Sequence, residues 1–138
     1  MRTTLFPTGW AHAGQVGRAI AALGLCLLAA TAQAQVSERW GAIAAAQQWF
    51  GYAFDHPSRA AAEQAARAQC ERVARRSGPC SVRAAFDRSC GALAQGNFGE
   101  WGAASAATEQ EAARDAAHQC NQHLPTEPCK VVVRVCSR

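Results

Sequence analysis

The sequence contains two related halves, and this internal repeat constrains the fold more than any other feature of the chain. The segment from Trp40 reads Trp-Gly-Ala-Ile-Ala, and the segment from Cys90 reads Cys-Gly-Ala-Leu-Ala. Four further cysteines recur in the same order, two in each half: Cys70, Cys80, Cys120 and Cys129. The shared order of these landmarks predicts two halves with the same elements, over about residues 40–88 and 90–138.

In the first half, the pattern predicts two strands, a helix and a third strand. The short apolar and aromatic runs over 40–46 and 49–55 indicate a hairpin. Ser58 is placed to cap an alanine-rich helix, because its hydroxyl can accept from the first-turn amides. After the Gly-Pro break, residues 80–86 read as the third strand.

The second half predicts the same order. Strands are expected over 90–95 and 101–107, followed by a helix that Thr108 and Glu111 begin as a capping box. The valine-rich run over 129–136 is the strongest strand signal in the chain, and we expect it in the centre of a sheet. The fold class is therefore α+β, with two ββαβ repeats forming one antiparallel sheet and two alanine-rich helices packed on it.

Residues 1–34 resemble a cleaved export signal of the Sec type. Arg2 and Arg18 precede the apolar run over 19–30, which ends in the small-x-small sequence Ala-Gln-Ala before Gln35. Residues 35–138 are then a single mature domain with 12 basic and 10 acidic residues, since Arg2 and Arg18 leave from the total of 14 basic residues. That small net charge disfavours nucleic acid as a partner, and cleavage would leave no stable membrane anchor.

The mature domain has a thin apolar core and needs covalent support. It contains 24 alanines but only 14 Val, Ile, Leu and Phe residues, so each apolar side chain buries little area. Six cysteines in an exported domain indicate three disulfides. The repeat pairs Cys70 with Cys80 and Cys120 with Cys129, and it leaves Cys90 for Cys136.

No residue pattern indicates catalysis, a metal or a cofactor. The cysteine spacings do not suit a structural zinc site, and a fully paired set leaves no free thiol as nucleophile. His118 and His123 lie five residues apart, which does not place them on one helix face, and His56 fits a turn. We therefore expect a protein that is not an enzyme and has no cofactor.

Aromatic residues concentrate in the two predicted hairpins and are absent from the helices. Helices on one face of a single sheet would leave the other face open, and exposed aromatics commonly anchor protein partners or flat sugar rings. The candidate binding surface consists of Trp40, Trp49, Phe50, Tyr52, Phe98 and Trp101.

These landmarks together resemble domain-of-unknown-function family 4189. The resemblance rests on the openings at Trp40 and Cys90, the Phe50-Gly-Tyr and Trp101-Gly steps, the helix start at Ser58 and the terminal Val-Cys-Ser. It implies a small exported bacterial protein with two related, disulfide-bridged halves and no established catalytic residues. Similar proteins include periplasmic immunity partners of toxic effectors in some Gram-negative bacteria and secreted proteins in mycobacteria.

The sequence and the resemblance lead to one main hypothesis of function. We expect a periplasmic or secreted, non-enzymatic module that binds another protein, such as an immunity protein or inhibitor that neutralises a toxic effector. The alternatives are a secreted factor acting on host or competitor cells and a module that binds cell-wall glycan.

Overall fold

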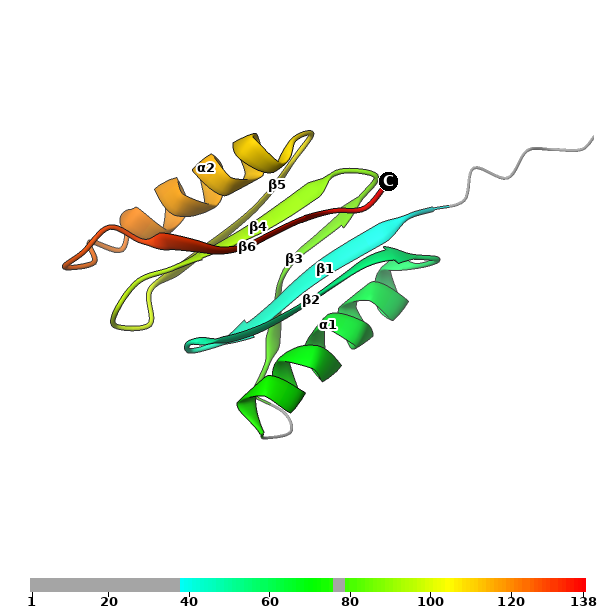
Figure 1. Cartoon of the computed structure of the whole chain (residues 1–138), viewed down its shortest axis with the longest axis horizontal. Coiled ribbons are helices and arrows are strands. Elements are labelled where there is room, and N and C mark those ends of the chain that lie inside the picture. The colour runs from blue at the N-terminus through cyan, green and yellow to red at the C-terminus, as the bar shows by residue number, and fades with distance from the viewer. Residues whose placement is uncertain (1–37, 76–78) are drawn as a thin grey trace, which may run out of the picture. The chain divides into compact units, whose positions relative to one another are not determined.

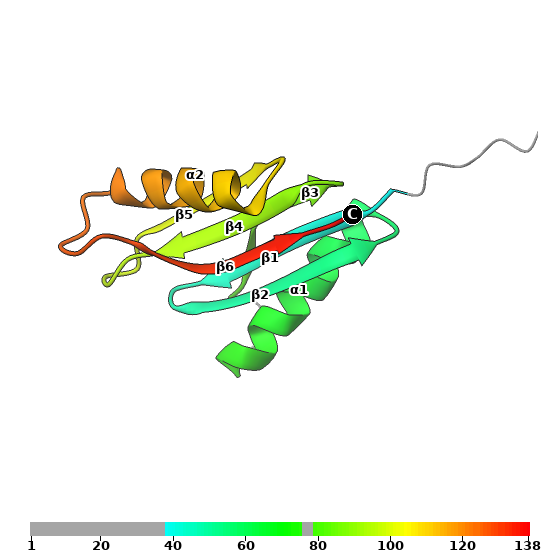
Figure 2. The same cartoon turned by 45° about the horizontal axis from the view of Figure 1, so that its top comes forward.

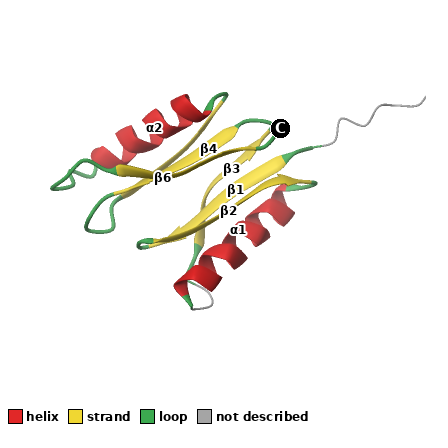
Figure 3. Ribbon diagram, viewed as in Figure 1, coloured by secondary structure: helices red, strands yellow, loops and turns green. Residues whose placement is uncertain are grey.

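The computed structural model describes residues 38–75 and 79–138, and the predicted signal segment lies outside them. Six strands and two helices follow one another in the predicted ββαβ order, twice (Figure 1). The elements are β1 (Trp40–Ala46), β2 (Trp49–His56), α1 (Arg59–Ala74), β3 (Ser81–Asp87), β4 (Cys90–Gln95), β5 (Trp101–Ala106), α2 (Glu109–Asn121) and β6 (Lys130–Cys136). The α+β class is confirmed (Figure 3).

The helices begin at the predicted capping residues. Ser58 Oγ accepts a hydrogen bond from the Ala61 amide at 3.2 Å, and Thr108 Oγ1 accepts one from the Glu111 amide at 3.2 Å. Both caps have extended backbone angles, as N-cap residues require. The local sequence therefore fixes where each helix starts.

The strands form two three-stranded antiparallel sheets rather than the single sheet expected. Their orders are β2-β1-β3 and β5-β4-β6, so each sheet belongs to one half of the chain. Ile43, Phe86 and Leu93 point away from the helices and are buried together. Since each helix covers only one face of its sheet, face-to-face packing of the two sheets is what removes these large side chains from water.

The domain thus has four layers, helix, sheet, sheet and helix (Figure 2). Alanines and cystine sulfurs fill the contact between α1 and the first sheet and the equivalent contact between α2 and the second. The predicted open sheet face is wrong, because the inner faces cover each other.

The central strands are β1 and β4, and the valine-rich strand β6 lies at a sheet edge, contrary to expectation. The centre is occupied by small side chains because β1 and β4 are covered on both faces, by a helix and by the other sheet. Residues 41–46 and 90–94 are all buried. The helix-facing positions of β1 and β4 are alanines and Cys90, where valines would be too bulky, and the larger Ile43 and Leu93 face the other sheet.

All three predicted disulfides are confirmed: Cys70–Cys80, Cys120–Cys129 and Cys90–Cys136. The first two join each helix to the strand that follows it. The third joins β4 to β6 across adjacent strands, with a Cα–Cα distance of 3.9 Å.

Two glycines show how closely the halves correspond. A Cβ on Gly51 of β2 would overlap the backbone of α1 at Ala66 and Cys70, and a Cβ on Gly102 of β5 would overlap the backbone of α2 at Ala116. Each helix therefore lies directly against the backbone of the second strand of its half. That approach fixes which face of β2 and β5 is turned inward.

Candidate functional site

The inner faces of the two sheets meet along two margins, which the repeat makes equivalent. β3 faces β5 along one margin, and β2 faces β6 along the other. Trp101 and Phe50 occupy equivalent positions in the two halves. Trp101 pairs with Gln95 of β4, Phe50 pairs with Ala45 of β1, and Gln95 and Ala45 correspond in the repeat. Differences between the two margins therefore come from side chains and not from topology.

A stacked pair lies on the β3–β5 margin. The register of β3 shifts between Ile43 and Ala44 of its partner strand, and Arg83 is the extra residue at this bulge. Its guanidinium carbon lies 4.1 Å from the centroid of the Trp101 ring, over one face of the indole, and Trp101 remains 37% exposed. Further along β5 the inward residue is the small Ala103, which packs in the core between the sheets.

The β2–β6 margin forms a groove of about 990 Å³, lined by aromatic, valine and charged side chains. β6 has a bulge at the corresponding place, between Leu93 and Ala94 of β4, and the extra residue there is Val132. Val132 has no guanidinium to stack on the equivalent ring, Phe50, and both side chains line the groove. The groove is lined by Phe50, Tyr52, Phe54, Asp55, Glu109, Val131, Val132, Val133, Arg134, Val135, Cys136 and Arg138.

One wall of the groove consists of three aromatic side chains on β2. Phe50, Tyr52 and Phe54 alternate with Gly51 and Ala53, which are buried against α1. Because side chains on a strand alternate between faces, all three rings turn toward the other sheet. Phe50 packs in the core between the sheets, whereas Tyr52 and Phe54 remain 36% and 52% exposed.

The other wall is the valine run of β6. Val132, Val133 and Val135 contact the core between the sheets, and Val131 is 39% exposed. The groove is therefore an extension of the apolar core that reaches the surface. Burial of one such aromatic or valine side chain by a partner is worth about 1.5–3 kcal/mol.

A polar cluster at one end of the groove ties the C-terminus to β2. The Asp55 amide donates to the Ser137 hydroxyl at 2.8 Å, and the Arg138 amide donates to Asp55 Oδ1 at 2.9 Å. Ser137 is fully buried. Asp55 has a φ of 56°, a left-handed conformation that aspartate tolerates better than most residues.

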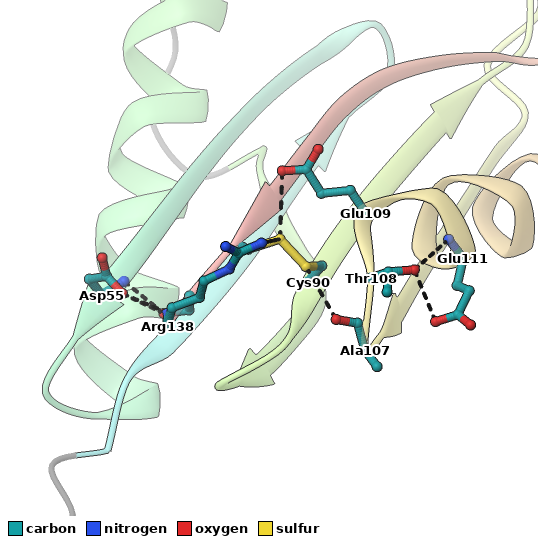
Figure 4. Close-up of a disulfide and its surroundings, with 9 residues drawn as sticks. Asp55, Cys90, Ala107, Thr108, Glu109, Glu111 and Arg138 are labelled. Atoms are coloured by element: carbon teal, nitrogen blue, oxygen red, sulfur yellow. Dashed lines mark hydrogen bonds between the residues drawn. A yellow bond between two sulfur atoms is a disulfide. The ribbon is translucent and has the colours of Figure 1, made fainter.

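Glu109, at the start of α2, lies on the other side of this cluster. Its Oε1 is 3.6 Å from the Cys136 sulfur, next to the Cys90–Cys136 disulfide and Arg138 (Figure 4). Arg39 approaches Asp55 to 3.9 Å from the start of the domain. The cluster therefore closes this end of the groove and links the two halves.

The sequence pattern of the family described as Domain of unknown function (DUF4189) matches residues 40–136. The chain belongs to this family. No curated protein and no solved structure matches the chain significantly. The matched range begins with β1 and ends with β6, so the DUF4189 unit comprises both repeats and all three disulfides.

The candidate surface predicted from the sequence is divided by the fold of this DUF4189 domain. Phe50 and Tyr52 lie together in the groove. Trp40 packs against the core beneath α1, and Trp101 stacks with Arg83 on the opposite margin and is 37% exposed.

The two remaining aromatics of that predicted surface lie outside the groove. Trp49 is 37% exposed, and it precedes Phe50 and so turns to the other face of β2. Phe98 is 77% exposed in the turn between β4 and β5.

The sequence reasoning missed the valines of β6 and Phe54. Phe54 carried a usable signal, because it stands two residues after Tyr52 and so shares its face. The valines carried none, because a valine-rich run indicates a strand but not whether it lies at the centre or the edge of a sheet.

Within residues 38–75 and 79–138, no group of three or more His, Cys, Asp or Glu side chains is arranged to hold a metal ion. In the same part of the chain, no helix is long and apolar enough to cross a membrane. Three disulfides are typical of proteins that fold in an oxidising, extracytoplasmic compartment.

Proposed function

We propose that this domain is an exported, non-enzymatic protein-binding module and that the groove between β2 and β6 is its binding site. The observation that carries the proposal is a difference between equivalent strands. After Trp101 the inward residue of β5 is the small Ala103, whereas β2 presents Tyr52 and Phe54, which stay 36% and 52% exposed beside the valines of β6. Two neighbouring aromatic rings left exposed over a groove favour a partner that covers them.

The groove has the properties of an interface centre. Its aromatic side chains stand on a strand held by α1, and its valine wall is joined to β4 by the Cys90–Cys136 disulfide. Rigid aromatic anchors lose little conformational entropy on binding. The disulfides and the signal-like residues 1–34 favour the periplasm as the compartment, where an immunity protein or inhibitor would meet a toxic effector.

A photo-cross-linking experiment tests this site. The protein is produced in its own cells with p-benzoylphenylalanine in place of Tyr52, and adducts are identified by mass spectrometry. A second protein carries the same probe in place of Phe98, which is exposed but outside the groove. We expect one dominant protein adduct from position 52 and none from position 98.

A second test gives the second half the residue that the first half has at the equivalent position, and it should weaken partner binding. Val132→Arg places a guanidinium at the position equivalent to Arg83, where it would stack on Phe50 and close the groove. Val73→Arg makes the same change on α1, where Val73 is 49% exposed. We expect Val132→Arg to weaken partner binding at least about tenfold and Val73→Arg to leave it unchanged.

Stability is measured for both variants, and Tyr52→Ala with Phe54→Ala serves as a second test that removes no buried side chain. If these groove variants bind the partner as the natural protein does, the binding site lies elsewhere. Sedimentation of the protein with purified peptidoglycan, without a protein adduct, would instead support the glycan-binding alternative.

A further inference from the structure

We infer that the partner enters the groove as an extended segment that adds to the free edge of β6 as a fourth strand of its sheet. We further infer that this segment alternates apolar with acidic residues. The inference rests on the proposed function and names the kind of partner that the groove accepts.

The free edge of β6 has backbone groups available for pairing. Among the strands that the structure describes, β6 pairs only with β4, and Cys90 and Cys136 face each other with Cα atoms 3.9 Å apart. So short a spacing marks a pair that exchanges no backbone hydrogen bonds, and such pairs alternate along an antiparallel ladder. Arg134, two residues before Cys136, therefore directs its N–H and C=O away from β4.

The edge of β2, across the groove, is less accessible. The Tyr52 amide already donates to Gln69 Oε1 of α1 at 2.8 Å. A helix side chain thus occupies the β2 edge in the middle of the strand, as proteins commonly do to block unwanted pairing. This difference assigns the added strand to β6.

A strand beside β6 would also cover the exposed aromatic wall. Tyr52 and Phe54 turn toward the second sheet, yet no strand of that sheet covers them fully. A neighbour of β6 would lie about 4.8 Å further out and present alternate side chains to these two rings. Those alternate positions of the partner are therefore apolar.

Charge selects the other positions of the segment. Arg134 lies on the opposite face of β6 from Val133 and Val135, since it pairs with Ala92, which packs against α2. Arg134 and Arg138 are exposed, neither makes an ion pair within the described residues, and 129–138 contains no acidic residue. The two acids in the groove are held within the domain, since Asp55 faces Arg39 and Glu109 lies at the N-terminus of α2. A segment with carboxylates is thus complementary to β6, and one with further cations is repelled.

Three pools of end-blocked peptides of about eight residues test the inference on the oxidised protein purified from the periplasm. The first pool alternates Val, Ile or Phe with Asp or Glu, and the second replaces the acids by Lys or Arg. The third repeats the first with N-methyl groups at alternate positions, which block strand pairing and keep the side chains. Retention is read by mass spectrometry, and protection of the Arg134 amide by hydrogen exchange.

We expect the acidic pool to be retained at least about tenfold better than the other two and to slow exchange of the Arg134 amide. Arg134→Glu with Arg138→Glu should reverse the preference between acidic and basic pools. Arg72→Glu with Arg114→Glu makes the same charge change on the two helices and should not reverse it.

Equal retention of the N-methylated pool would show that no strand is added, and equal retention of the basic pool would show that charge does not select the segment. Either result overturns the inference, as does no retention of the acidic pool. In all three cases, a protein cross-linked at position 52 would still support the groove as a binding site, so the two proposals fail separately. The cations of β6 would then serve only to prevent association through its edge.

Discussion

Phe86 holds the two sheets together, and its removal is the sharpest test of the fold. Its side chain is 3% exposed and lies between Gly41 of β1 and Gly91 of β4, where a Cβ on either glycine would overlap the ring. The core between the sheets contains few other large side chains, so little can collapse into the space. We expect Phe86→Ala to lower the free energy of unfolding by about 4 kcal/mol.

A substitution at Gly41 distinguishes the loss of Phe86 packing from a general loss of stability. Gly41→Ala alone forces a methyl group into the Phe86 ring and should cost about 2 kcal/mol. In a Phe86→Ala background the same methyl group enters vacated space, and alanine restricts the unfolded chain more than glycine does. The double variant should therefore be as stable as Phe86→Ala or about 0.5 kcal/mol more stable.

The assay is guanidinium unfolding of the oxidised proteins, followed by tryptophan fluorescence and circular dichroism. The coupling energy between Gly41 and Phe86 should be about 2 kcal/mol, whereas independent sites add within about 0.5 kcal/mol. Gly99→Ala is the control, because Gly99 has a φ of 92° and nothing lies within 4 Å of its added Cβ. Its cost of about 1 kcal/mol should not depend on Phe86. Additive costs for Gly41→Ala and Phe86→Ala would refute the packing described between the sheets.

Three further substitutions have defined outcomes in the same unfolding assay. Thr108→Ala removes the cap of α2 and should cost about 1 kcal/mol, and an unchanged midpoint would show that the cap contributes nothing. Ser137→Ala leaves the Asp55 amide without its acceptor and should cost about 1–3 kcal/mol, whereas a loss below that range would mean that water replaces the hydroxyl. Arg83→Met keeps the aliphatic stem over Trp101 but removes the cation, and should cost about 1 kcal/mol, while a gain in stability would contradict a favourable stacked pair.

Much of the architecture follows from the sequence because it depends on neighbours along the chain. Ser58 and Thr108 mark the helix starts, since capping is a contact across three residues. The cysteine pairs within each half follow from their equivalent places in the repeat, and they leave Cys90 and Cys136 for each other. These features need no knowledge of how the halves meet.

The arrangement of the halves was decided only in three dimensions. Two ββαβ units can join edge to edge in one sheet or stack face to face, and the local pattern is the same in both cases. Stacking is favoured because Phe86 of the first half fits between glycines of both central strands. That complementarity involves three positions far apart in the sequence, so no local pattern reveals it.

The groove, too, was determined partly by the sequence and partly by the tertiary structure. The sequence by itself determined that Phe50 and Tyr52 belong to an aromatic strand and that 130–135 is a strand. Only the tertiary structure decided that these two strands line one groove and that Trp101 lies on the opposite margin. The reason is that each margin joins a strand of one half to a strand of the other, and which strands meet depends on how the two sheets stack.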